Sequence, residues 1–334
     1  MIRSLALTPA LLAALFSACS TGSTLRQEAA PDLVKRQEEI KAKEKKQRNF
    51  QRVIIQLDQM IDNYVTAIAN RGDQRADDQA EKLLKLLREK VLDIPSRRPG
   101  RQLEANDHQP GEFFQRLRQL AMDGSLPEQQ AVALAALGFS GRFDVMNDIL
   151  QGARTNDPFV IDHAVLGLAV LRSRDTPPGV LAAIAENPNH PEDGRVQAAW
   201  ALYQVQTSCV DQSEIAKIWV DFLGTKRNKL PPGVLVTAIR GLGLTTKAEY
   251  AGLVAPLLKD PTPRIRMSAA VALGRMNAKE YWQELLNLLR PQESVQNVRL
   301  SARKSLARLA GDQDYGYDIS AWLKVFELGN KQRQ

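Results

Sequence analysis

The stretch Ala269-Ala-Val-Ala-Leu-Gly274 is one copy of a small-residue signature that occurs six times in this chain. The copies begin, in order, at Ala133, Ala164, Ala198, Ala238, Ala269 and Ala302, so their starts lie 31, 34, 40, 31 and 33 residues apart. Periods in this range are typical of solenoids, in which one unit cannot bury its apolar face without its neighbours. The spacing therefore predicts an all-α fold, an α-solenoid of about six helix pairs that displays a long surface.

The composition agrees with a helical fold. Hydrophobic residues make up 44% of the 334 residues, charged residues 25% and aromatic residues 6%. These values are ordinary for a globular protein, and the low aromatic content with abundant Ala and Leu favours helix over strand. Because a repeat array grows along one axis, the length alone sets no number of domains.

The first residues have the pattern of an export signal. Arg3 precedes a mostly apolar run from Leu5 to Leu15, and small residues lead to Cys19. The run is shorter than the roughly 20 residues that a spanning helix needs, and its features are those of a secretory signal peptide. The segment resembles the lipobox of bacterial lipoproteins, which implies that residues 1–18 are removed and that Cys19 carries the lipid. The alternative is an ordinary signal peptide that contains a cysteine by chance.

The same resemblance implies a location. Ser20, and not Asp, follows the cysteine, and in enterobacterial lipoproteins the absence of Asp at this position directs the protein to the outer membrane. We therefore expect the chain on the periplasmic face of the outer membrane, where acyl chains on Cys19 hold it.

The segments between the anchor and the repeats differ in character. Residues 19–48 are expected to be a charged tether, because the run Lys41–Arg48 has helical propensity but almost no apolar face. Alternatively, its lysines contact anionic lipid headgroups or peptidoglycan. Residues 49–94 contain two amphipathic stretches around a turn at Asn70–Asp73. They predict a helical hairpin, which either caps the first repeat or forms a dimer contact. Residues 95–111, punctuated by Pro and Gly, are expected to be an irregular linker.

The clearest repeat turns at Asp260-Pro261-Thr-Pro263 and continues through Arg264-Ile-Arg266 into the signature. Asp can cap a helix, Pro fits its first turn, and Ala and Gly let neighbouring helices approach closely. This combination resembles the HEAT-repeat family, especially its short variety akin to phycobiliprotein-lyase repeats. The resemblance covers residues 112–311, and residues 312–334 are expected to close the open end as a C-terminal cap.

The other copies depart from this pattern by degrees. The arginine position is occupied by another residue in three copies, which have Gln130, Ile161 and Leu235. The third copy keeps Arg195 together with Asp193. Any ladder of Asp and Arg along the stack is therefore expected to be partial. The fourth copy carries a longer basic turn, residues 224–233, that is expected to project from one edge.

The sequence contains no catalytic constellation. Its three histidines, His108, His163 and His190, have no second His or Cys at ligand spacing, so we expect no metal site and no cofactor. Ser301-Ala-Arg-Lys304 matches the Ser-x-x-Lys pattern of penicillin-recognising enzymes, but the motifs that complete that site do not occur. Beside Cys19, only Cys209 remains, and its context fits a small buried filler. We therefore expect a protein that is not an enzyme.

Helical periodicity points to a binding surface. If the first, fourth and fifth letters of each signature are buried, then the residue before it, its third letter and the residue after it face a groove on the concave side. The polar and aromatic residues at these positions are His163, Gln197, Trp200, Gln204, Arg240, Arg275, Lys304 and Arg308. They predict a partner-binding groove with one aromatic anchor and a basic C-terminal end. Alternatively, Trp200 fills a gap between repeats and the arginines are solvated.

The sequence favours a non-catalytic scaffold or adaptor that binds proteins of the cell envelope. The net charge of +7 also fits nucleic-acid binding. An exported and membrane-anchored chain rarely meets nucleic acid, however, so acidic partners are preferred. The alternatives are an enzyme-associated subunit of the phycobiliprotein-lyase-like repeat class and a nucleic-acid-binding helical-repeat protein.

Overall fold

The computed structural model describes residues 31–69, 81–82, 85 and 111–331. The chain divides into two units, Met1–Gln51 and Arg52–Gln334. The predicted signal peptide, Cys19 and the linker 95–110 lie outside the described residues, as does most of the second helix of the predicted hairpin. None of the described helices is at once long and apolar enough to span a membrane.

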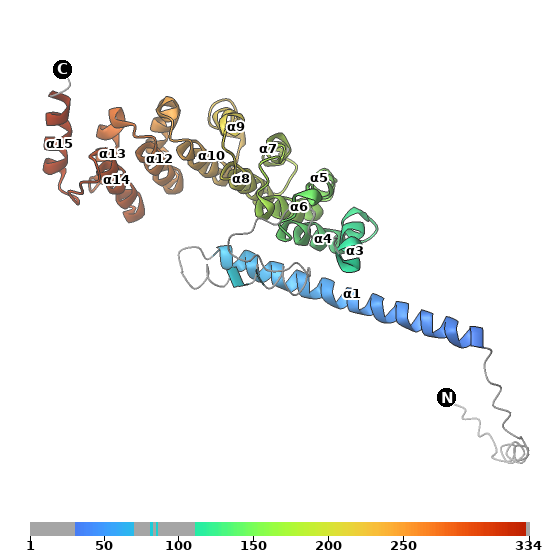
Figure 1. Cartoon of the computed structure of the whole chain (residues 1–334). Helices are drawn as coiled ribbons and strands as arrows, with labels where there is room; N and C mark the ends of the chain where they lie inside the picture. Colours follow the sequence, from blue (N-terminus) through green and yellow to red (C-terminus); the bar gives the residue numbers. More distant parts are fainter. Residues whose placement is uncertain (1–30, 70–80, 83–84, 86–110, 332–334) are drawn as a thin grey trace, which may run out of the picture. The chain divides into compact units, whose positions relative to one another are not determined.

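Helix α1 (Pro31–Ala69) begins in the first unit and ends in the second (Figure 1). The boundary expected at residue 48 between tether and hairpin therefore falls inside a continuous helix. All side chains from Asp32 to Asn49 are exposed, as expected for a run that lacks an apolar face. From residue 52 onward the helix is amphipathic, and Ile54, Leu57 and Ile61 are 4%, 0% and 2% exposed. We call residues 52–69, which belong to the second unit, the arm.

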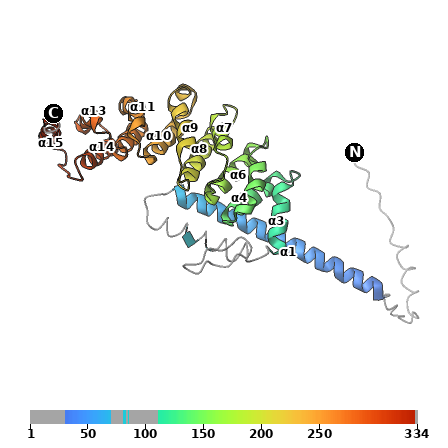
Figure 2. The same cartoon turned by 45° about the horizontal axis from the view of Figure 1, so that its top comes forward.

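The second unit contains two rows of helices, which Figure 1 and Figure 2 show side by side. The signature row consists of the six helices that carry the signature, each packed on the next: α4 (Pro127–Phe139), α6 (Pro158–Leu171), α8 (Glu192–Gln206), α10 (Pro232–Leu244), α12 (Pro263–Arg275) and α14 (Gln296–Leu309). The partner row consists of α3 (Glu112–Met122), α5 (Met146–Gly152), α7 (Pro178–Glu186), α9 (Ser213–Leu223), α11 (Ala251–Val254) with η5 (Ala255–Lys259), and α13 (Trp282–Leu289). The connections contain four short 3-10 helices, η2 (Phe143–Val145), η3 (Arg227–Lys229), η4 (Ala248–Tyr250) and η6 (Lys279–Tyr281).

Each helix of the signature row packs on one helix of the partner row, so the pairs form repeats 1 to 6 along the stack. The described residues contain no β-strand. The predicted α-solenoid of six helix pairs is therefore confirmed.

Glycines of the signature allow neighbouring helices to approach closely. A Cβ atom on Gly138 would lie 2.2 Å from the carbonyl oxygen of Gly167 on the next signature helix, and one on Gly274 would lie 2.6 Å from Oγ of Ser305. Both distances are too short for a side chain without movement of the backbone or its neighbours. The small residues in the repeated pattern are thus required by packing between repeats.

The position three residues before each signature, which is Arg266 in the clearest repeat, has a structural role that Gln130 shares. Helices leave carbonyl groups without partners at their C-terminal ends. In four repeats the side chain at this position donates a hydrogen bond to such a carbonyl at the end of the partner-row helix: Gln130 to Ala121 (3.1 Å), Arg195 to Ala185 (3.0 Å), Arg266 to Asp260 (2.9 Å) and Arg299 to Leu289 (3.3 Å). Ile161 and Leu235 are buried apolar residues at the corresponding position. Arg195 also donates to the Lys229 carbonyl at 3.1 Å, so the bonds found for Arg195 are to backbone oxygens.

The basic turn 224–233 is tied to the repeats on both sides. Lys226 forms ion pairs with Glu186 of repeat 3 (2.8 Å) and Asp221 of repeat 4 (2.6 Å). Arg227 pairs at 2.7 Å with Asp260, whose side chain is 7% exposed, at the start of the turn into α12. The turn is therefore held to adjacent repeats, because two of its cations find acidic partners there.

Helix α15 (Ile319–Lys331) follows repeat 6. Its Trp322 is 0% exposed, and Phe326 stacks on Trp282 of α13 with ring centroids 5.1 Å apart. These aromatic contacts cover apolar surface of the last repeat, which has no following repeat to pack on.

Candidate binding surface

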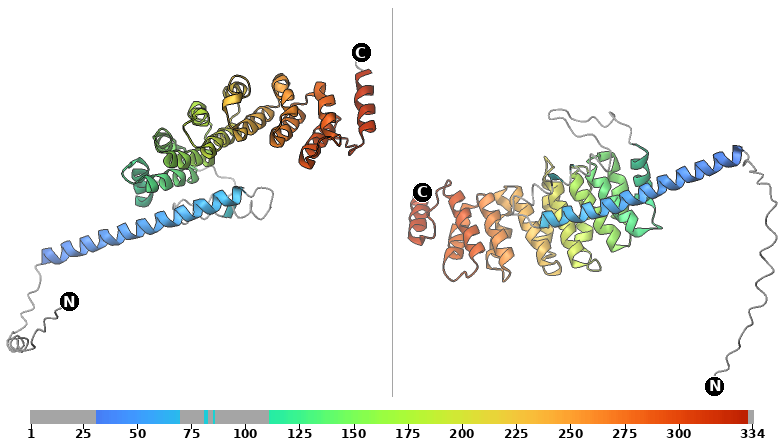
Figure 3. Two further views of the ribbon diagram at one scale, coloured as in Figure 1. Left: turned by 180° about the vertical axis from the view of Figure 1, so that it is seen from behind. Right: turned by 90° about the horizontal axis from the view of Figure 1, so that it is seen from below.

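One face of the signature row carries all eight residues that the sequence suggested for a partner site. Side chains one turn apart on a helix share a face, so four positions of each signature helix line up from repeat to repeat. We call this set the signature face: Glu128, Val132, Ala135 and Phe139; Phe159, His163, Leu166 and Val170; Asp193, Gln197, Trp200 and Gln204; Gly233, Thr237, Arg240 and Leu244; Arg264, Ser268, Val271 and Arg275; and Asn297, Ser301, Lys304 and Arg308. The row of helices that carries it can be followed from two further sides in Figure 3.

In repeat 1 three of the four residues of the signature face are apolar and buried. Val132, Ala135 and Phe139 are 5%, 0% and 0% exposed. The ring of Tyr64, on the arm, contacts the ring of Phe139 edge-on with centroids 4.8 Å apart. The arm thus packs on the signature face of repeat 1.

A charged residue of the arm extends this contact toward repeat 2. Partial burial raises the pKa of Asp58, and the neighbouring Asp62 carboxylate raises it further. The His163 imidazole on α6 opposes this by lowering the pKa of Asp58, whereas Glu128 on α4 raises it. Asp58 therefore lies within electrostatic reach of two residues of the signature face, which belong to repeats 1 and 2.

The predicted site residues of repeats 2 and 3 are engaged within the protein. The Nδ1 atom of His163 is 2.9 Å from the Phe159 carbonyl oxygen, and the two rings lie 4.4 Å apart. Gln197 Nε2 donates to the Asp162 carbonyl at 2.9 Å, which links α8 to α6. Gln204 is 4% exposed, and Trp200 is half-buried. Gln197 and Gln204 thus contribute to packing between repeats, and the indole of Trp200 remains partly accessible.

In repeats 4 to 6 the signature face is basic and open. Arg240, Arg275, Lys304 and Arg308 are exposed, and none forms an ion pair with another described residue. Arg264, one turn before the positions chosen from the sequence, is exposed and unpaired in the same way. Extending the helical period by one turn would have found it. These five cations, which we call the basic track, have no acidic residue among them on the signature face.

Comparison with known proteins places a family on this part of the chain. Residues 221–307 match the family model of HEAT repeats. This segment is therefore similar to HEAT repeats. It contains α10 of repeat 4, the whole of repeat 5 and most of repeat 6, and with them four of the five cations of the basic track.

Two further comparisons concern the whole chain. Among solved structures, it is similar to the complex of CpcE and CpcF of phycocyanin lyase from Nostoc sp. PCC7120, with 16% sequence identity and a TM-score of 0.36. The similarity covers 78% of this chain and 92% of that chain. No curated protein sequence matches this chain.

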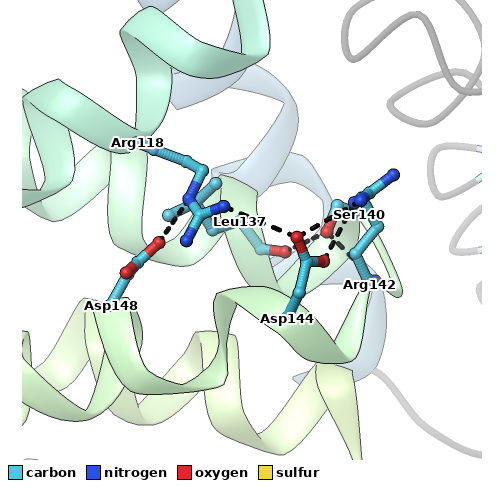
Figure 4. Close-up of polar contacts among 6 residues, drawn as sticks. All are labelled: Arg118, Leu137, Ser140, Arg142, Asp144 and Asp148. Atoms are coloured by element: carbon cyan, nitrogen blue, oxygen red, sulfur yellow. Dashed lines mark hydrogen bonds and ion pairs between the residues drawn. The ribbon is translucent and has the colours of Figure 1, made fainter. Parts of the chain in front are cut away.

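Outside residues 221–307, an ion-pair network joins α3 to α5 in repeat 1 (Figure 4). Arg118 of α3 pairs with Asp148 of α5 at 2.6 Å and with Asp144 at 3.5 Å, and Asp144 also pairs with Arg142 at 3.0 Å. The hydrogen bond to Asp148 raises the pKa of Arg118. All charges of this network are matched, so it holds the first two partner-row helices together and leaves no group free for chemistry.

The described residues with reactive side chains are engaged structurally. No group of three or more His, Cys, Asp and Glu side chains in the described ranges is arranged to hold a metal ion. His190 is 2% exposed at its side chain and pairs with Asp162 at 2.8 Å, and Ser301 Oγ donates to the Asn297 carbonyl of its own helix. Burial raises the pKa of the Cys209 thiol, which disfavours the reactive thiolate. The cations of the basic track, by contrast, form no ion pair with another described residue.

Proposed function

We propose that this chain is a non-catalytic scaffold that binds partner proteins of a bacterial cell envelope through its signature face, and that Cys19 anchors it to the outer membrane as a lipoprotein. The observation that carries the proposal is the contrast along this face. Phe139 of repeat 1 contacts the protein's own arm, whereas repeats 4 to 6 present exposed cations without ion-pair partners among the described residues. A row of packed helices holds such groups in fixed relative positions, which is what a recognition surface requires.

Trp200 and Arg240 are the residues on which a partner would depend most. They lie on adjacent signature helices, α8 and α10, where the covered part of the face gives way to the basic part. Trp and Arg are enriched among residues that dominate binding energies. The face thus offers an aromatic anchor beside a charged one.

The anchor is supported by the sequence of the first 19 residues, and the helix that follows is suited to a spacer. An α-helix rises 1.5 Å per residue, so the stretch Pro31–Gln51 spans roughly 30 Å. Its side chains from Asp32 to Asn49 are exposed, so it forms no core of its own. We propose that this segment separates the repeats from the membrane surface.

The experiment is affinity capture from native membranes with the tagged full chain, its W200A and R240A variants, and R290A as a matched control. Arg290 is an exposed cation at the end of α13 in the partner row. We expect W200A and R240A to lose the captured protein and R290A to keep it, with helical circular dichroism unchanged in all three. Equal capture by all variants would reject the signature face as the binding site.

The same sample tests the anchor. Mass analysis of the mature N-terminus is expected to show removal of residues 1–18 and acyl chains on Cys19, and C19S is expected to leave the membrane fraction. An intact N-terminus, or cleavage without acylation, would refute the lipoprotein assignment and leave the binding site to be judged by the capture alone.

A further inference from the structure

We infer that the basic track binds an acidic helical segment of the partner protein. This inference rests on the proposed function, since it names the chemistry of the partner at the same face. Arg240, Arg264, Arg275, Lys304 and Arg308 give this part of the face five positive charges and no negative one. Complementary charge is the feature that selects a partner at such a surface.

The spacing of the cations fits a helix. Neighbouring helices pack with their axes about 8–10 Å apart, so Arg275 and Arg308, at the same position of two successive signature helices, follow one another at about that interval. Residues seven apart on an α-helix share a face and are separated by about 10.5 Å along its axis. Acidic residues at seven-residue spacing on a partner helix would therefore lie opposite the cations of successive repeats.

Apolar side chains lie between the cations. Leu244 on α10 and Val271 on α12 are half-buried on the signature face, and Trp200 borders the track on the side of repeat 3. A purely polyanionic ligand would leave these apolar side chains uncovered. An amphipathic helix would cover them with apolar residues while its acids reach the arginines.

The arm shows that the same face accepts a helix of this kind. It contributes Tyr64 to an aromatic contact with Phe139, and its Asp58 lies within electrostatic reach of His163. The described part of α1 before the arm is no candidate for the basic track, because between Asp32 and Gln51 it has seven Lys and Arg against four Asp and Glu. In line with the proposed function, we assign the occupant of repeats 4 to 6 to a segment of another protein.

The test measures the binding of two fluorescein-labelled synthetic peptides to the full chain. The first is helical and carries Glu at seven-residue spacing next to Leu on one face, and the second is a scrambled peptide of equal composition. The variant R275E/K304E/R308E removes three cations of the basic track and keeps Trp200 and Arg240 for the capture experiment. The matched control K217E/K259E/R290E makes the same change of charge at exposed cations of the partner row. Circular dichroism and thermal melting establish that both variants fold.

We expect the helical peptide to bind the full chain more tightly than the scrambled one. The track variant is expected to weaken binding by about tenfold or more, the control by about twofold at most, and added salt to weaken binding throughout. Equal loss in both variants, or equal binding of both peptides, would overturn the inference. So would tighter, track-dependent binding of a single-stranded oligonucleotide or of phosphatidylglycerol vesicles. If the peptide fails while native capture still depends on Trp200, the scaffold function stands and only the acidic helix is rejected.

Discussion

The ring of Tyr64 meets the ring of Phe139 edge-on, with centroids 4.8 Å apart and an interplanar angle of 85°. Phe139 is the last residue of α4 and occupies the same place on its helix as Arg275 on α12 and Arg308 on α14. In repeat 1 this position is buried beneath a helix of the same chain, and in repeats 5 and 6 it is an exposed cation. The same position of the signature helices therefore makes an internal contact at one end of the stack and lies on an open surface at the other.

Replacing Tyr64 by alanine is expected to loosen the arm. An aromatic pair contributes about 0.5–1.5 kcal/mol beyond the area that it buries. Hydrogen exchange of residues 52–69 in Y64A should therefore be faster, by about two- to tenfold, than in the wild type. The matched control is V65A, since Val65 is 43% exposed on the same helix. Equal exchange in Y64A and the wild type would mean that the ring contact does not hold the arm.

Gly138→Ala is expected to destabilise the array. The added Cβ would lie 2.2 Å from the Gly167 carbonyl oxygen, so the two helices must move apart. Overpacking of this kind costs about 1–3 kcal/mol, which chemical denaturation followed by circular dichroism will measure. Gly179→Ala is the control, because nothing lies within 4 Å of its Cβ position in α7. A destabilisation in the control as large as that in G138A would remove close approach as the cause.

The Arg266–Glu293 pair is expected to make stability depend on acidity. The hydrogen bond from Arg266 lowers the pKa of Glu293, whose ordinary value is 4.5. Because the folded-state pKa is depressed, the stabilisation is complete above the unfolded-state value and is lost as the pH falls through the folded-state pKa. The melting temperature of E293Q should therefore fall less than that of the wild type between pH 6 and pH 3. E280Q, at an exposed residue, should follow the wild type. Parallel curves for E293Q and the wild type would contradict this account.

Removing Arg266 from the same pair is expected to lower the free energy of unfolding more than removing the charge of Glu293 does. The side chains of Arg266 and Glu293 are 16% and 7% exposed, and two bonds of 2.8 Å join them. R266A leaves the Glu293 carboxylate with the Val295 N–H as a donor but without its cation, and losing hydrogen bonds to a charged group costs about 1.5–3 kcal/mol. R264A, two residues away at an exposed position, is the control. The free energy of unfolding is measured by denaturant titration. Equal unfolding midpoints of R266A and R264A would contradict the expectation.

Trp322→Ala is expected to open the C-terminal end of the stack. Trp322 is fully buried, its Nε1 donates to the Gly316 carbonyl at 3.1 Å, and its ring lies against Phe326. Removing a buried tryptophan costs about 3–5 kcal/mol. Hydrogen exchange should rise in α13 and α14 and stay unchanged in α4 and α6, because repeats contact only their neighbours. A uniform rise along the array would instead indicate a single cooperative unit.

The repeat period and the small-residue signature were sufficient to predict the helices, their number and their stacking. These features are local, since a helix pair that exposes an apolar stripe must find a neighbour whatever the rest of the chain does. The exposed cations Arg240, Arg275, Lys304 and Arg308 were also expected on one face from the sequence, and their role in binding stays a prediction. Arg264 was missed only because the helical period was not carried one turn further.

Contacts between residues far apart in sequence required the tertiary structure. Gln130 replaces an arginine and yet bonds the Ala121 carbonyl, because its position at the start of α4 and its amide group matter more than its charge. Arg227 is held by Asp260 of the next repeat, so the basic turn lies against the stack.

The amino-acid sequence by itself determined that this chain forms a solenoid and that one end of its signature face is basic, because helix period and side-chain charge are properties of short stretches. Only the tertiary structure decided that Tyr64 covers Phe139. An amphipathic helix such as the arm will bury its apolar face on any suitable surface. Which surface lies within reach is decided by the packing of all the repeats together.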